Sequence, residues 1–132
     1  MRTRTKARQR AVEALFEAEQ RSVSVNEVLE RNPAVNDYAI AIAKLTEENL
    51  ARVDEVINTY SSDWPTNRMP AVDRAILRVA VAELIYEKDL NSSVIISEAV
   101  EISESLSTPD SGKFINGLLG NIAAIRDTLG SL

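Results

Sequence analysis

The amino-acid sequence predicts an all-α protein, and two observations support that prediction. Apolar residues recur at helical spacing through nearly the whole chain of 132 residues. The chain also has only four glycines, too few for a sheet protein rich in turns. At this length, with 45% hydrophobic residues, we expect a single globular domain with a substantial core.

Three helices are expected in the first half of the chain. The first covers about Thr5 to Gln20, where alanines and a leucine repeat at helical spacing. A short second helix covers about Val25 to Arg31 and ends before Pro33, because proline disfavours helical geometry in the residue that precedes it. A long third helix starts at Asn36 or Asp37.

The segment from Ser61 to Pro70 interrupts the helical pattern and contains two of the four prolines. It follows the long third helix, whose core-facing residues run from Tyr38 to Tyr60. We expect it to link two helical halves, residues 1–62 and 70–132, that share one core. Trp64 is expected to anchor this linker against the core.

After Pro70 the apolar residues cover most of the helix circumference, which predicts a central and buried fourth helix. Four charged residues interrupt it: Asp73, Arg74, Arg78 and Glu83. Buried charges are tolerated when they are paired or reach the surface. Each of the four therefore makes either an internal ion pair, such as Arg78 with Glu83, or contact with a partner.

Two further helices complete the chain. The fifth covers about Ser93 to Leu106 and carries three glutamates that we interpret as a solvated face: Glu98, Glu101 and Glu104. The sixth opens near Asp110 or Ser111, either of which is suited to cap it. Gly117 and Gly120 each cost this helix about 1 kcal/mol relative to alanine, which indicates that another group approaches it closely at those positions.

The start of the chain is basic although the whole chain has a net charge of -5. Five of the first ten residues are cationic and none is acidic: Arg2, Arg4, Lys6, Arg8 and Arg10. Arg4 and Arg8 line up with Ala11 and Leu15 while the others lie opposite, so the helix start is expected to be basic all round and to overhang the core. Cations there oppose the helix dipole by about 0.3–1 kcal/mol each, which favours binding of a polyanion over a solvated terminus.

Composition excludes several classes of enzyme. Without any cysteine or histidine the chain has no thiol nucleophile, no cysteine-ligated zinc and no Ser-His-Asp arrangement. An enzyme would have to use carboxylates, lysine or tyrosine. The candidate carboxylates are Asp73, Glu83 and the pair Glu98 and Glu101, and no metal or nucleotide motif organises them. The apolar runs fall far short of the roughly 20 residues of a membrane span, and no signal-peptide pattern is present, so we expect a cytoplasmic protein without cofactors.

Three stretches resemble the NusB family of bacterial transcription factors. They are the basic opening from Arg4 to Phe16, the run DRAILRVA from Asp73 to Ala80 with Glu83-Leu84 after it, and Glu98 to Glu101 followed by KFINGLL from Lys113 to Leu119. The resemblance spans nearly the whole chain in the right order. It implies two small helical bundles packed as one NusB-like domain. The same fold occurs in an rRNA cytosine methyltransferase, but 132 residues of helical bundle leave no room for a cofactor domain.

The resemblance also implies a function. Members of the family bind the single-stranded boxA element of rRNA leader transcripts, pair with the ribosomal protein NusE, and act in an antitermination complex with RNA polymerase. We therefore expect a non-catalytic antitermination factor. The alternative is a helical protein–protein interaction module that binds no RNA, and formation of a homodimer stays open.

By the same resemblance, two sets of residues are assigned to partners. The RNA-contacting positions are Arg4, Lys6, Arg8, Phe16, Asp110, Lys113 and Phe114. The face for the ribosomal protein includes Asp73 and Arg74. Phe16 lies off the Ala11 and Leu15 stripe, so it either stacks on an unpaired base or packs in the bundle.

Overall fold

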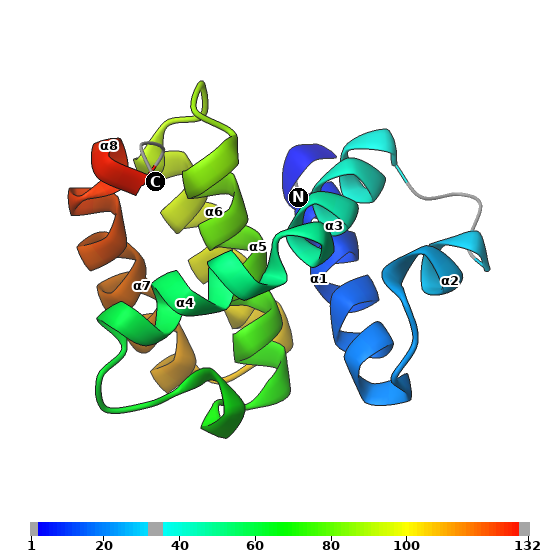
Figure 1. Cartoon of the computed structure of the whole chain (residues 1–132), viewed down its shortest axis with the longest axis horizontal. Coiled ribbons are helices and arrows are strands. Elements are labelled where there is room, and N and C mark those ends of the chain that lie inside the picture. Colours follow the sequence, from blue (N-terminus) through cyan, green and yellow to red (C-terminus); the bar gives the residue numbers. More distant parts are fainter. Residues whose placement is uncertain (1–2, 32–35, 130–132) are drawn as a thin grey trace.

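A computed structural model of the chain describes residues 3–31 and 36–129, which form helices and no strand, as predicted (Figure 1). Among these residues no helix combines the length and apolar character needed to span a bilayer. The elements follow in the order α1 (Thr3–Arg21), α2 (Val25–Glu30), α3 (Asp37–Glu48), α4 (Leu50–Tyr60), a short 3-10 helix η1 (Thr66–Arg68), α5 (Ala71–Tyr86), α6 (Ser92–Leu106), α7 (Pro109–Ala124) and α8 (Arg126–Leu129).

Helices α1, α2 and α3 pack against one another on one side of the molecule (Figure 1). The Ser24 side chain caps α2 by accepting a hydrogen bond from the Glu27 N–H, and the Asn36 side chain caps α3 by accepting one from the Tyr38 N–H. The predicted second helix is confirmed. Pro33, the residue expected to end it, lies outside the described residues.

The prediction of one long third helix is wrong, because the helix breaks at Asn49. This residue has φ -115° and ψ 24°, outside the helical range, and its side-chain amide donates to the Leu45 carbonyl at 2.9 Å, to which its backbone N–H also donates at 3.2 Å. Beyond the break, α4 packs against α5 and α7. The division into helical halves at residues 1–62 and 70–132 stays a prediction.

Helix α5 is the centre of the fold, as its all-round apolar pattern predicts. It contacts α1, α3, α4, α6 and α7, and its apolar side chains from Ala75 to Ile85 are buried. The linker before it is anchored as expected: Trp64 packs against the core, and its ring meets the Phe114 ring edge-on with centroids 5.0 Å apart. One hydrophobic core thus joins the helices on both sides of the break at Asn49.

The start of α7 differs from the prediction. Thr108, rather than Asp110 or Ser111, is the cap, since its hydroxyl accepts a hydrogen bond from the Ser111 N–H at 3.2 Å. The expected close approach at Gly117 and Gly120 is also wrong: among the described residues, no atom from outside this stretch of helix lies within 4 Å of a Cβ built at either position.

Replacing Gly117 or Gly120 with alanine is therefore expected to stabilise the protein by about 0.5–1 kcal/mol each, because alanine loses less backbone entropy in a helix. Urea denaturation of the single variants measures this change. Gly112→Ala is the matched control in the same helix. Its Cβ would lie 3.3 Å from the Oγ of buried Ser103, so this variant should gain nothing. Destabilisation by Gly117→Ala would contradict the open surface described for that position.

Candidate nucleic-acid interface

The first turns of α1 expose three of the predicted cations. Arg4 and Lys6 are exposed, and the Arg10 side chain is 46% exposed with a loose contact of 3.8 Å to Glu13. Arg2 lies outside the described residues. The helix start is therefore an exposed basic surface on a chain that is acidic overall.

Arg8 departs from this pattern, so the expectation that the helix start is exposed all round is wrong. Its side chain is only 3% exposed, and its Nε donates to the Glu83 carboxylate at 2.7 Å. A second ion pair joins Arg8 to Glu98, which also accepts a hydrogen bond from the Thr5 hydroxyl at 2.8 Å. Arg8 thus joins α1 to buried carboxylates of α5 and α6, and its contact with RNA stays a prediction.

The prediction that the three glutamates of α6 form a solvated face is also wrong at one position. Glu104 is exposed and Glu101 is half-buried, but Glu98 is 3% exposed. Glu98 follows Ile95 by three residues and precedes Ile102 by four, so it belongs to the buried side of the helix. There it meets Arg8 instead of water.

Tyr38 of α3 completes this buried cluster. The sequence pattern placed it on the core side of the third helix and indicated no part for it in the site. Its hydroxyl donates to the Glu83 carboxylate at 2.6 Å, and its ring lies under the Arg4 guanidinium at 4.2 Å. Burial and the bond to Glu83 raise the pKa of Tyr38, so the hydroxyl stays a donor. Burial likewise raises the pKa of Glu83, against the opposing effect of its donors Tyr38 and Arg8.

Asp73, assigned to the partner face, is buried at 1% exposure. One of its carboxylate oxygens accepts a hydrogen bond from Ser107 at 2.7 Å and the other from Ser111 at 2.8 Å. These bonds fix the turn between α6 and α7. The partner role of Asp73 stays a prediction, and in this conformation its carboxylate is occupied within the chain.

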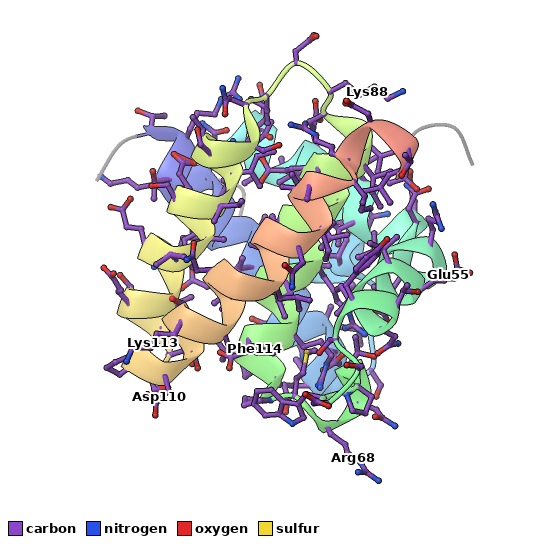
Figure 2. The ribbon with its side chains drawn as sticks, turned by 90° about the vertical axis from the view of Figure 1, so that its left-hand side faces the viewer. Glu55, Arg68, Lys88, Asp110, Lys113 and Phe114 are labelled. Atoms are coloured by element: carbon purple, nitrogen blue, oxygen red, sulfur yellow. The ribbon has the colours of Figure 1, made fainter. Side chains whose placement is uncertain are left out.

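Three further predicted RNA-contacting residues lie in the first turns of α7 (Figure 2). Asp110 and Lys113 are exposed. Phe114 is half-buried and meets Trp64 edge-on, with an angle of 67° between the rings. Part of the Phe114 ring surface is thus already used in the fold.

Arg74 also bonds within the chain. It forms an ion pair with Glu19 of α1, and it donates to the carbonyls of Thr66 and Met69 at 2.9 Å each. Its side chain is 14% exposed. Arg74 therefore ties the linker to α1, and its predicted contact with a partner stays a prediction.

The suggested ion pair between Arg78 and Glu83 is wrong. Arg78 instead donates to both carboxylate oxygens of Asp54, at 2.9 and 2.8 Å, and to Glu19 at 2.6 Å. Residues five apart in a helix point in different directions, so Arg78 faces α4 and α1 while Glu83 faces Arg8. The bidentate ion pair between Arg78 and Asp54 holds α4 beside α5.

The hydrogen bond from Arg74 lowers the pKa of Glu19 below its ordinary value of 4.5, and Arg78 lowers it further. A carboxylate of this kind stabilises the fold above pH 4.5, and that stabilisation is lost as the pH falls through the lowered pKa. Glu19→Gln should therefore be less stable than wild type near neutral pH, and the difference should shrink below pH 4.5. Urea denaturation between about pH 3 and about pH 7 measures it. Glu17→Gln on the same helix controls for net charge, and a constant difference for Glu19→Gln across that range would contradict the expectation.

Phe16 is half-buried on α1 and lines a hollow of about 220 Å³. Leu50 of α4, with Ala71, Ala75 and Arg78 of α5, forms its other walls. Phe16 therefore packs partly against the core and borders this hollow, and its contact with RNA stays a prediction.

Apart from Phe16, the predicted RNA-contacting residues form two groups near opposite ends of α5. Arg8 meets α5 at Glu83, whereas Ser111 meets it at Asp73. Ten helical residues span about 15 Å, so these two points of contact lie about that far apart along α5. Figure 2 shows Asp110, Lys113 and Phe114 together at the lower end of the molecule, far from Lys88 at the upper end.

Comparisons with known proteins agree over nearly the full length of the chain. The model of the NusB family matches residues 5–124. Transcription antitermination protein NusB of Kineococcus radiotolerans is 48% identical over 134 residues, which cover 98% of each chain. The solved structure of T. maritima NusB superposes with a TM-score of 0.84 at 36% identity, covering 94% of this chain and 93% of that one. A chain from the crystal structure of antitermination factors NusB and NusE in complex with dsRNA matches with a TM-score of 0.81 at 26% identity, covering 94% of this chain and 98% of that one.

Proposed function

We propose that this chain, which belongs to the NusB family, is a non-catalytic adaptor that binds boxA-type single-stranded RNA together with the ribosomal protein NusE. In that role it helps RNA polymerase in the cytoplasm to read through terminators. The observation that carries the proposal is the exposed basic start of α1, with Arg4, Lys6 and Arg10, on a chain whose net charge is -5.

The charge distribution suits an adaptor that needs both partners. The cations at the start of α1 attract phosphates, whereas the acidic excess of the rest of the chain repels them. A basic protein partner relieves this repulsion, and simultaneous binding adds affinity through effective concentration. A relative in complex with NusE and dsRNA supports this combination of partners.

The buried carboxylates favour an adaptor over an enzyme. Glu83 and Asp73 are each 1% exposed and accept hydrogen bonds from other side chains of the chain. Glu98 is likewise buried and paired with Arg8. These carboxylates hold helices together, and we assign them that structural role.

One RNA strand can contact both ends of the molecule only if it is long enough. The separation of about 15 Å along α5 corresponds to roughly four to five stacked nucleotides at about 3.4 Å each. We therefore propose that the strand runs from Arg4 and Lys6 toward Lys113. Shorter oligonucleotides should bind through one end only.

Fluorescence anisotropy tests this proposal with a labelled boxA-type RNA, its scrambled form and its duplex, each with and without the ribosomal protein. Wild type should prefer the single-stranded boxA form, and the ribosomal protein should strengthen binding. Arg4→Glu/Lys6→Glu should weaken it and reduce the salt slope by about 1.4, because each lost phosphate contact removes about 0.7 from the slope.

The matched control is Lys44→Glu/Arg21→Glu, which makes the same change in charge at exposed positions outside the predicted residues. It should bind RNA like wild type. Equal losses in both double variants would show that only net charge matters. Absence of RNA binding with and without the ribosomal protein would leave the protein–protein interaction module as the function.

A further inference from the structure

Two predicted RNA-contacting cations, Arg4 and Arg8, lie over the Tyr38 ring, and of the two only Arg4 is exposed. Its Cζ lies 4.2 Å from the centre of the Tyr38 ring, within the range of a cation–π contact. Arg4 itself is exposed, while Tyr38 is half-buried. The pair thus presents a planar group to solvent with an aromatic support below it.

The support is fixed from below. The Tyr38 hydroxyl donates to Glu83 at 2.6 Å, and Glu83 is held by Arg8 at 2.7 Å with exposures of 1% and 3%. Turning the Tyr38 ring away would remove one of the donors of a buried carboxylate, which is costly in free energy. The ring under Arg4 is therefore tied to the framework of α1, α3 and α5.

Unpaired RNA bases stack on aromatic rings and also on the flat guanidinium of arginine. Lysine also contacts a phosphate, as a point charge, whereas stacking needs the planar guanidinium of arginine. We propose that Arg4, positioned by Tyr38, is a stacking platform for one unpaired base of the RNA. This inference rests on the proposed RNA-binding function and assigns Tyr38 as a positioning residue within it.

Arg4→Lys separates phosphate contact from base stacking, because it keeps the positive charge and removes the planar guanidinium at an exposed position. Its affinity for the single-stranded RNA should fall about 5- to 150-fold, the equivalent of about 1–3 kcal/mol for one stacked base. The salt slope should not change, since the number of neutralised phosphates stays the same. Arg21→Lys, at the exposed other end of the same helix, is the control and should leave both quantities unchanged.

Variants of Tyr38 test the support. Tyr38→Leu removes the ring and should weaken RNA binding in the same range as Arg4→Lys. Tyr38→Phe keeps the ring and loses only the bond to Glu83, so its loss should be smaller. Circular dichroism and thermal denaturation of each variant establish that the fold is retained before binding is compared.

A scan of single abasic sites along the RNA locates the stacked base. In wild type one abasic site should weaken binding strongly, and this penalty should disappear in Arg4→Lys and Tyr38→Leu. If wild type binds RNA but Arg4→Lys matches it at every abasic site, the platform is wrong and the RNA-binding function stands. If wild type does not bind the RNA, the proposed function itself fails.

Discussion

Arg8→Met is expected to destabilise the protein by about 3–5 kcal/mol, the cost of removing one partner from a buried ion pair. Arg8 is the cation between Glu83 and Glu98, and all three side chains are at most 3% exposed. Methionine fills similar space but leaves two buried carboxylates without their cation. Urea denaturation at neutral pH measures the loss.

Arg10→Met is the matched control two positions along the same helix, where the side chain is 46% exposed, and it should change stability by less than about 0.5 kcal/mol. A second test neutralises the whole cluster. Arg8→Met/Glu83→Gln/Glu98→Gln should regain part of the lost stability, because the uncompensated charges are gone. Equal stability of Arg8→Met and Arg10→Met would contradict the buried cluster.

Arg126→Met is expected to cost about 2–4 kcal/mol, because several hydrogen bonds from a charged donor are lost together. The guanidinium donates to the carbonyls of Leu84, Glu87 and Leu90 at 2.9, 2.8 and 2.6 Å, and to the Ser92 hydroxyl at 2.9 Å. The end of α5 leaves carbonyls without partners inside the helix, and a cation is favoured there.

Two measurements check this expectation. Urea denaturation gives the global loss, and amide hydrogen exchange should show faster opening at the end of α5 and in residues 87–91 than at the start of α5. Arg126→Lys keeps the charge but lacks the three nitrogen donors of the guanidinium, so its stability should fall between those of Arg126→Met and wild type. If Arg126→Met unfolds like wild type, the carbonyls at the end of α5 do not depend on this side chain.

Most of the helices were predictable because their periodicity is local. The buried side of α5 and the short α2 follow directly from the spacing of apolar residues. The break at Asn49 was not, since neither proline nor glycine marks it. The helical pattern continues across it while the direction of the chain changes.

For the charged residues, too, some positions were predictable from the sequence and others were not. Arg4 and Lys6 are exposed as predicted, and their contact with RNA stays a prediction. Arg8 was misplaced although the sequence held a sign of its burial, because it lines up with Ala11 and Leu15 on the apolar side of α1. Its partner Glu83 lies 75 residues away, and a single sequence does not reveal such a pairing.

Trp64 is the only tryptophan of the chain, and its ring lies against Phe114 at the start of α7. Its intrinsic emission is therefore an optical reporter of that end of the molecule. A ligand that stacks on or displaces Phe114 alters the emission, whereas one held only by Arg4 and Lys6, beyond the far end of α5, leaves it unchanged. Occupancy of the Phe114 end can thus be followed in unlabelled protein.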